Sequence, residues 1–421
     1  MDLRKRQLRP DSRERRPAPS PRDPNVKVRF RTSLHNTVCD VMSSLDGWGE
    51  TDSEMDWDLH WADVGWIREY YDLVQPKLHE HQRLNHFKNH YELTRKDLLI
   101  KNLKRMKKQQ AKTEVGVAAA DFWSLTFVLP MEYGMFLEEF KRYPGAMWIM
   151  KPIGKAQGKG IFLFEKLSQI SDWKKDHTWK SDGLQAKTSD TYIVQKYIQN
   201  PYTIGGKKFD LRLYVLVTSF SPLVVWMYRA GFGRFSNARY SQAKADMDNL
   251  YMHLTNASVQ KTAHDYDKSM GSKWPLDSIK QFLVSKHGVR AVDSLFYDIQ
   301  SVITKSLVAV QPILIQDKHC FELYGYDVLI DSDLKPWLVE VNASPSLTGD
   351  TNEDYGLKWN LVAHTMQVVD MLKTRTGAER HVGGFDLIWD GGPLQDAHPD
   401  GYLTYLGCAF DRLPHKRPAK A

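Results

Sequence analysis

The chain has 421 residues, of which 42% are hydrophobic and 26% are charged, and its formal net charge is +7. This length is enough for two or three lobes, and the composition excludes a globally disordered chain. No apolar run approaches the roughly 20 residues of a membrane-spanning helix, so we expect no membrane partner. Three cysteines and an N-terminus without an apolar signal region favour a reducing, cytoplasmic compartment.

Two basic segments lie near the start of the chain. Residues 1–25 hold eight basic and four acidic side chains with five prolines, which predicts a disordered basic arm. Residues 95–112 hold eight basic side chains and one acidic, so the rest of the chain carries −4. Leu99, Leu103 and Met106 recur among these cations at a helical spacing, which predicts an amphipathic docking helix. Its partner could be an acidic polypeptide, nucleic acid or an anionic membrane, or the helix face could simply be solvated.

The remaining chain divides into lobes and a tail. We expect a small N-terminal lobe over residues 26–120, a central lobe over 121–218, and a C-terminal lobe over 219–372 that contains one long helix ending before Pro312. Residues 373–421 are predicted to form a largely irregular tail. The mixture of β-hairpins and packed helices favours an α+β protein over a parallel doubly wound fold.

A glycine-rich loop follows a strand-like run that ends at Lys151. Gly154, Gly158 and Gly160 permit backbone conformations closed to other residues, and their N–H groups can cradle phosphate oxygens. Two more lysines in the loop, Lys155 and Lys159, add positive charge. The spacing fits neither the Walker motif nor the dinucleotide fingerprint. We therefore interpret the segment as a β-hairpin lid over a nucleotide, with a basic surface hairpin as the alternative.

Two apolar strand-like runs flank a polar turn at residues 331–336. If these strands pair symmetrically about the turn, Asp327 faces Glu340, Asn342 lies on the same face, and Val339 points to the opposite face, into a core. Two neighbouring buried carboxylates repel each other unless one is protonated or a cation lies between them. Oxygen ligands of this kind suit Mg²⁺ shared with ATP phosphates, although a hydrogen-bonded acid pair remains the alternative.

Two histidines at a helical spacing, His86 and His90, lack the glutamate of the zincin pattern. We interpret them as packing or surface residues.

Together the glycine-rich loop and the hairpin resemble the tubulin–tyrosine ligase-like family, whose core is an ATP-grasp fold. The resemblance extends over about residues 26–372, and residues 382–388 also resemble a polyglutamylase branch of the family. It rests on Asn89-His-Tyr-Glu-Leu-Thr-Arg-Lys96, Trp148-Ile-Met-Lys-Pro152, Gln157-Gly-Lys-Gly160, Gly206-Lys-Lys-Phe-Asp-Leu-Arg212, His253-Leu-Thr-Asn256 and Glu340-Val-Asn-Ala-Ser-Pro-Ser-Leu347. The central and C-terminal lobes would then be the two ATP-grasp lobes.

The resemblance implies that ATP and Mg²⁺ are cofactors. The ATP-binding residues that it implies are Lys151, Gln157, Gly158, Gln195, Lys196, Tyr197, Ile198, Lys208, Phe209, Asp210, Thr255 and Asn256. The metal ligands that it implies are Asp327, Glu340 and Asn342, the same three residues as the hairpin argument.

The resemblance also implies a reaction in which ATP turns a carboxylate into an acyl phosphate, which the amine of a free amino acid then attacks. Arg212 and Lys151 would be catalytic, and Arg212 suits the acyl phosphate because its planar fork is always charged. Arg234 and Lys261 would hold the amino acid, although the residues alone would favour ordinary solvated cations. The protein substrate would contact Gln157 and the docking cations. Those cations are Lys104, Arg105, Lys107 and Lys108.

By resemblance, the protein is expected to be a tubulin polyglutamylase that adds free L-glutamate to the acidic C-terminal tails of tubulin in microtubules. A tubulin glycylase, a tyrosine ligase, a ligase for small molecules and a non-catalytic microtubule-binding subunit remain alternatives. The second carboxylate of glutamate needs a cation, which favours glutamate over glycine. Companion glutamylase subunits are possible partners, and no nucleic-acid signature is present. The resemblance also implies the cytoplasm and cytoskeleton, with the cilium, axoneme and basal body.

Overall fold

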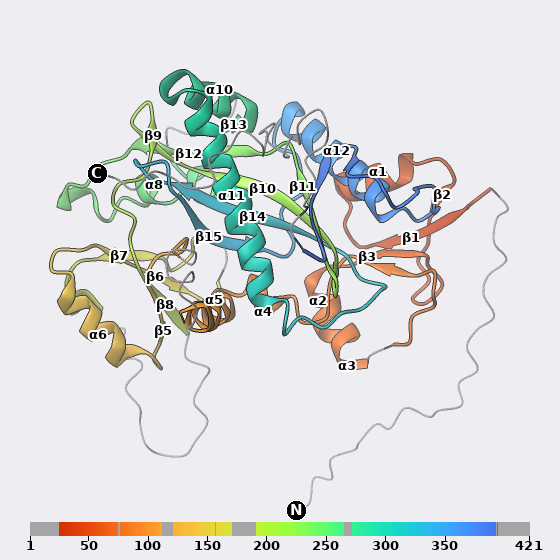
Figure 1. Ribbon diagram of the computed structural model, residues 1–421, viewed down its shortest axis with the longest axis horizontal. Coiled ribbons are helices and arrows are strands. Elements are labelled where there is room, and N and C mark those ends of the chain that lie inside the picture. Colours follow the sequence, from red (N-terminus) through yellow and green to blue (C-terminus); the bar gives the residue numbers. More distant parts are fainter. Residues whose placement is uncertain are drawn as a thin grey trace, which may run out of the picture.

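The structure is a computed structural model, and it describes residues 25–74, 76–111, 121–155, 157–170, 191–264, 272–392 and 394. The expected disordered arm lies outside these ranges except for its last residue. The described residues form three β-sheets surrounded by helices, which confirms a mixed α and β architecture (Figure 1).

Helices of very different length surround the sheets. They are α1 (Thr37–Ser44), α2 (Val64–Trp66), a π-helix (Ile67–Tyr71), α3 (Asp72–Val74), α4 (Tyr91–Thr94), α5 (Lys96–Gln110), α6 (Tyr133–Arg142), α8 (Leu250–His253), α9 (Ala257–Gln260), α10 (Leu276–His287), α11 (Val289–Val310) and α12 (Asn352–Val369), with 3₁₀ turns at Leu167–Ile170 and Lys244–Asp246. None of the helices in the described part combines the length and apolar character that a membrane crossing requires.

The largest sheet is antiparallel and is built around the long strand β10, which pairs with β9, β11, β12 and β14. Its strands are β9 (Thr203–Ile204), β10 (Lys207–Phe220), β11 (Leu223–Tyr228), β12 (Phe232–Arg239), β13 (Lys273–Pro275), β14 (Glu322–Ile330), β15 (Pro336–Asn342), β16 (His381–Val382) and β17 (Phe385–Asp390). Because side chains alternate along a strand, Leu211 and Leu213 of β10 enter the hydrophobic core while Asp210 and Arg212 lie on the other face.

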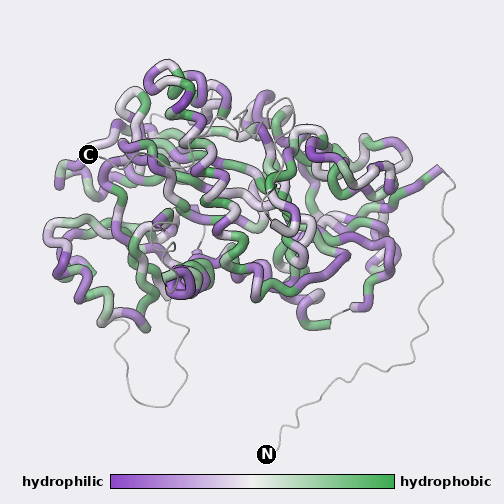
Figure 2. The backbone as a smooth tube through the Cα atoms, viewed as in Figure 1, coloured by the Kyte–Doolittle hydropathy of each residue, from purple (hydrophilic) through white to green (hydrophobic). Residues whose placement is uncertain are grey.

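The predicted long helix is α11, and it lies across β10 and β14 (Figure 1). Its buried stripe includes Leu295, Ile299 and Ile303, at the i, i+4, i+8 spacing of one helix face. The helix ends at Val310, before Pro312, as predicted. Figure 2 shows hydrophobic residues concentrated along the central strands and hydrophilic ones on the outer loops.

A smaller antiparallel sheet lies beside the large one, in the order β5-β8-β6-β7 (Figure 1). Its strands are β5 (Thr126–Leu129), β6 (Trp148–Pro152), β7 (Phe162–Phe164) and β8 (Tyr192–Lys196). Phe127, Phe136 and Trp148 form a separate hydrophobic core between this sheet and α6. Since β6 pairs with β7, the predicted hairpin on either side of the glycine-rich loop is confirmed.

The N-terminal region has a third, parallel sheet, in the order β2-β1-β3-β4. Its strands are β1 (Val28–Thr32), β2 (Trp48–Glu50), β3 (Leu59–Trp61) and β4 (Arg83–Leu84). Phe30, Leu59 and Leu84 belong to the same hydrophobic core as the large sheet, so this region packs as part of one continuous body. The predicted docking helix is α5.

One predicted boundary needs correction. The division between residues 218 and 219 falls inside β10, because this strand continues through Phe220 and pairs with β11 on both sides of the division. The tail was predicted to be largely irregular, and its described part contains two short strands, of which β17 pairs with β11 and extends the large sheet. The apolar side chains of Phe385, Leu387 and Trp389 recur at every second position of β17, which stabilises the added strand.

Candidate active site

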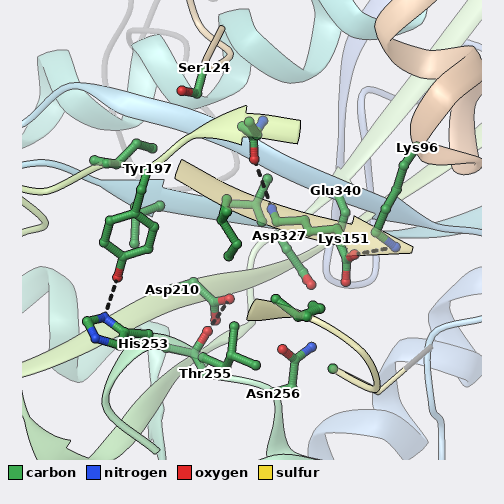
Figure 3. Close-up of a pocket in the computed structure, with 18 of the residues that line it drawn as sticks. Lys96, Ser124, Lys151, Tyr197, Asp210, His253, Thr255, Asn256, Asp327 and Glu340 are labelled. Atoms are coloured by element: carbon green, nitrogen blue, oxygen red, sulfur yellow. Dashed lines mark hydrogen bonds and ion pairs between the residues drawn. The ribbon is translucent and has the colours of Figure 1, made fainter. Parts of the chain in front are cut away.

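A cavity lies between the small antiparallel sheet and the large sheet, and strands of both supply its walls (Figure 3). It is partly open to solvent, and polar and apolar side chains both line it. Every predicted ATP-binding residue except Phe209 lines it, and so do Asp327, Glu340 and Asn342. Phe209 is fully buried on the opposite face of β10, where it stacks on Phe235.

One wall of the cavity carries the buried lysine of β6. Lys151 Nζ donates a hydrogen bond to Gln195 Oε1 on the neighbouring strand at 2.9 Å, and Gln195 Nε2 donates to Thr126 Oγ1 at 3.0 Å. Burial lowers the pKa of Lys151 to about 8, since a charged ammonium is poorly solvated there. Carboxylates farther away, Glu340 among them, partly offset this effect.

A second buried lysine lies on β10 at the other end of the cavity. Lys208 Nζ donates to Tyr197 Oη at 2.9 Å and to the His253 carbonyl at 2.8 Å. Tyr197 Oη in turn lies 3.0 Å from His253 Nδ1 (Figure 3). Burial lowers the pKa of Lys208 to about 7, and the charge of Lys151 adds to the effect. Near neutral pH Lys208 is therefore only partly charged and Lys151 is mostly charged, and an entering anion favours the charged form of both.

The floor of the cavity is a row of alternating charges across β14, β10 and β12. Arg212 Nε lies 2.6 Å from Asp327 Oδ1, and Arg234 Nη2 lies 2.7 Å from Asp327 Oδ2. Arg234 also pairs with Asp210 at 2.7 Å through Nε, and Thr255 Oγ1 donates to Asp210 at 2.7 Å. Burial alone would raise the pKa of Asp327, but the two guanidiniums overcome it and hold that pKa well below its usual range.

The hairpin of β14 and β15 has the predicted pairing at the end that carries Asp327 and Glu340. Asp327 is the partner of Glu340, and Asn342 is the partner of Gly325. Nearer the turn the register shifts by one, because Val339 is an extra residue that forms a β-bulge. Val339 was predicted to face a core, but the bulge turns it toward the cavity that it lines.

The two hairpin carboxylates avoid repulsion by separate cationic partners. Asp327 lies between two arginines, whereas Glu340 Oε2 lies 3.1 Å from Lys96 Nζ (Figure 3). Asn342 Nδ2 lies 3.5 Å from Asp327 Oδ2. Lys96 was not singled out as a site residue from the sequence, although it ends the motif Asn89–Lys96 on which the resemblance rests.

The glycine-rich loop folds over the cavity opposite the hairpin. Gly158 has a φ of +78°, and a Cβ there would lie 2.7 Å from Val259 Cγ2 on α9. Ser258 Oγ donates to the Gln157 carbonyl at 3.3 Å, which adds a second contact between the loop and α9. Lys155 lines the cavity, whereas Lys159 lines a separate groove outside it, between the loop and α8 and α9.

Several predicted site residues lie away from the cavity lining. Lys261 is a partly exposed residue at the end of α9, and its Nζ pairs with Asp350 at 2.7 Å. Arg212 is not among the lining residues, and its Nε and Nη2 donate to the Asp327 carboxylate. Arg234, by contrast, lines the cavity and is only 6% exposed, so the alternative of a solvated cation is wrong for it.

Intramolecular contacts engage three of the four predicted docking cations. Lys104 Nζ pairs with Glu132 at 2.7 Å, and Arg105 Nη2 donates to the Ala309 carbonyl at 2.8 Å. Lys107 and Lys108 are exposed on α5, and Lys107 Nζ lies 5.7 Å from the centroid of the Trp123 ring. The docking surface that the helix can offer is therefore smaller than its charge suggested.

The fold and this cavity, with buried lysines facing an acid–arginine cluster, are typical of an enzyme that handles phosphates. A model of the tubulin-tyrosine ligase family matches residues 74–377. The chain therefore belongs to the tubulin-tyrosine ligase family and is a ligase, as the resemblance predicted.

Similar proteins show which named members of that family the chain resembles. The chain is 47% identical over 432 residues to the probable tubulin polyglutamylase TTLL9 of Bos taurus, covering 94% of this chain and 93% of that one. It is 48% identical to the probable tubulin polyglutamylase ttll-9 of Caenorhabditis elegans, over 86% of this chain and 85% of that one. The probable alpha-tubulin polyglutamylase Ttll1 of Tetrahymena thermophila is 43% identical, over 86% and 93%.

Proposed function

We propose that this protein is an ATP-dependent tubulin polyglutamylase that joins free L-glutamate to glutamate side chains in the acidic tails of tubulin. The observation that carries the proposal is the cavity in which two buried lysines and an acid–arginine cluster face the same space. The relatives that match over most of their length are named as tubulin polyglutamylases, and this supports the choice of substrate.

ATP is proposed to bind with its adenine along Gln195–Ile198 and its phosphates between the glycine-rich loop and the hairpin. Lys151 and Lys208 support the binding of a polyanion here, because both line the cavity and a nearby anion favours their charged forms. Gly158 supports it as well, since its positive φ lets the backbone approach a phosphate closely.

Asp327, Glu340 and Asn342 fit a Mg²⁺ ion that arrives with the nucleotide. Their donors are oxygens, which this ion prefers. Both carboxylates already have cationic partners, so their charge is balanced without a metal, and phosphates would supply further ligands. When bound, Mg²⁺ would neutralise charge that develops on the transferred phosphoryl group.

In the proposed reaction, a carboxylate oxygen of the acceptor glutamate bonds to the terminal phosphorus of ATP and ADP leaves. The amine nitrogen of free glutamate, having lost a proton, then bonds to the acyl carbon while the C–O bond to phosphate breaks. Arg212 gives Nε and Nη2 to Asp327, and among the described residues its Nη1 has no hydrogen-bond partner. We assign that donor to the acyl phosphate and the tetrahedral centre.

The carboxylates of the incoming glutamate are assigned to Arg234 and Lys261. Arg234 faces the cavity but is already shared between Asp210 and Asp327, so a substrate would take a third position on its guanidinium. Lys261 would exchange Asp350 for a substrate carboxylate. The acceptor tail is assigned to Gln157 and the exposed cations Lys107 and Lys108. The cytoskeleton, and by resemblance the cilium, axoneme and basal body, are the proposed locations.

The test is mass spectrometry of tubulin tails after incubation with the purified protein, ATP, Mg²⁺ and a mixture of labelled Glu, Gly and Tyr. We expect glutamate to be added, and we expect Glu340→Gln to abolish this while Glu353→Gln, an exposed glutamate on α12, retains it. Incorporation of glycine or tyrosine instead would identify the alternative ligases. Microtubule binding without any incorporation, even with companion subunits added, would identify a non-catalytic subunit.

A further inference from the structure

We propose that Glu322, on the core-facing side of β14, is a positioning residue that aligns the proposed metal-binding hairpin with the segment that carries Lys96. Its carboxylate is completely buried and lies outside the cavity. The inference rests on the proposed function only for the metal ion that the hairpin would bind.

The Glu322 carboxylate joins two distant parts of the chain. Oε1 lies 2.9 Å from His86 Nδ1, and Oε2 accepts from the Phe87 backbone N–H at 3.1 Å and from Tyr324 Oη at 3.0 Å. A buried carboxylate without such donors would be costly, so these three bonds fix its position. Two of them come from the segment just after β4, more than 230 residues earlier in the sequence.

That segment leads directly to the cavity. Leu84 N–H donates to the His319 carbonyl, and the Asn89 side chain bonds to the backbone at Ile313 and Ile315. The same segment continues through α4 to Lys96, whose Nζ contacts Glu340. The Glu322 contacts therefore fix the position of this segment along β14 and β15, and with it the position of the Lys96 ammonium.

His86 extends the network toward the end of the hairpin. Because a carboxylate can only accept, His86 Nδ1 carries the hydrogen, and Nε2 of a neutral ring can accept from Ser344 Oγ, 3.4 Å away. Ser344 follows Asn342 by two residues, and the next residue, Pro345, packs on Gly325, where a Cβ would come within 2.8 Å of it. The loop after the hairpin is therefore held at two points, by His86 through Ser344 and by β14 through Pro345.

A metal ion among His86, His90 and Glu322 is the competing interpretation, since their ligand atoms lie within 4.8 Å of one another. Both Glu322 oxygens already accept hydrogen bonds, and His90 Nδ1 lies 3.1 Å from the Phe87 carbonyl. Metal binding there would break bonds that are now satisfied, so the contacts favour a positioning network.

The test measures nucleotide binding by the full-length protein with a fluorescent ATP analogue, with and without Mg²⁺, alongside the melting temperature. Glu322 bonds to the segment that carries Lys96 and not to a proposed metal ligand itself, so the loss of about one hydrogen bond sets the expected scale. We expect Glu322→Gln to raise the half-saturating Mg²⁺ by about 2- to 12-fold, with metal-free nucleotide affinity unchanged. Tyr324→Phe is the matched control, because it removes a bond to the same carboxylate from β14 itself. It should lower stability with less than about a twofold change in the Mg²⁺ requirement.

A second pair of variants keeps the proposal testable if Glu322→Gln folds poorly. His86→Asn retains a donor near Nδ1 but removes Nε2, and Ser344→Ala removes the exposed partner, with Ser346→Ala as control on the same loop. Each should raise the Mg²⁺ requirement by about 2- to 12-fold, and the double variant should match the single ones.

Equal effects of Glu322→Gln and Tyr324→Phe, additive effects of the pair, or a stoichiometric transition metal in the purified protein would overturn the proposal. Absence of glutamate transfer with normal Mg²⁺-dependent binding would count against the proposed function instead.

Discussion

Two buried lysines set the charge of the cavity before any ligand enters. Lys151 and Lys208 lie on strands of different sheets, and burial lowers their pKa values to about 8 and 7. The acids of the cavity are already paired with Arg212, Arg234 and Lys96. A polyanion such as ATP would therefore be bound partly by proton uptake at the lysines.

The first prediction is that ATP binding weakens as the pH rises from 7 to 9, because the ligand-free protein then loses these protons. The folded pKa of Lys151 lies below its unfolded value of about 10.5, so the unfolded chain binds more protons between pH 8 and 10.5. The stability of the ligand-free protein should thus rise with pH over that window, by up to about 3 kcal/mol from this group.

Lys151→Met provides the check on that assignment. It should make the rise of stability with pH smaller, leaving the part that comes from Lys208, and it should weaken ATP binding, since a neutral side chain neither titrates nor attracts phosphate. Lys286→Met, on the exposed end of α10, is the control. Denaturant unfolding and nucleotide titration at several pH values measure both effects, and an unchanged pH dependence in Lys151→Met would contradict the prediction.

At the scale of elements, the glycine-rich loop is fixed in place by α9. Gly158 combines a φ of +78° with a Cβ position only 2.7 Å from Val259 Cγ2. Gly154, four residues earlier, has neither constraint, since nothing lies within 4 Å of its Cβ position. The two glycines therefore separate the effect of loop geometry from that of loop composition.

We expect Gly158→Ala to weaken ATP binding about 10-fold or more, because the left-handed backbone costs about 1–2 kcal/mol for a residue with a Cβ and the steric overlap adds to it. Adding Val259→Ala should restore part of the loss by relieving the overlap, and Gly154→Ala should have little effect. Equal losses for the two glycine variants, measured by nucleotide titration, would show that the loop is not held by α9.

The elements also show how far the sequence could predict this site. Alternation along two strands was enough to bring Asp327 opposite Glu340, because one face of the hairpin is apolar. The bulge at Val339 has no glycine or other local signal and depends on tertiary packing. The partner of Lys104 is Glu132, just before α6, and that of Arg105 is in α11, so no spacing within α5 could predict that these cations are engaged. His86 was similarly interpreted alone, since Glu322 lies too far along the chain to be paired with it by pattern.

At the scale of the whole molecule, the tail completes the large sheet. β17 pairs with β11 along its whole length, and its side chains Phe385 and Leu387 are buried. Asp386, also buried, forms an ion pair with Arg229 of the neighbouring segment. Truncation after residue 372 should therefore destabilise the protein by several kcal/mol, at about 1.5–3 kcal/mol for each large apolar side chain re-exposed. Thermal unfolding of the truncated and full-length proteins measures the loss. A melting temperature equal to that of the full chain would mean that β17 does not contribute.

Attraction between the protein and microtubules belongs to the same scale, and the structure narrows the part of α5 that can provide it. Lys107→Glu with Lys108→Glu changes two exposed charges and removes one contact, that of Lys107 with the Trp123 ring. A glutamate at Lys104 would instead repel Glu132 and confuse docking with stability. We expect the double variant to raise KM for microtubules at low salt without changing kcat for a saturating substrate. The difference should shrink as salt increases, because exposed charges are screened within about 8–10 Å.

Lys286→Glu with Arg290→Glu is the control. It makes the same change of net charge near α10 and should leave KM nearly unaltered. If both double variants raise KM equally, overall charge attracts the acidic tails and α5 is not their docking surface.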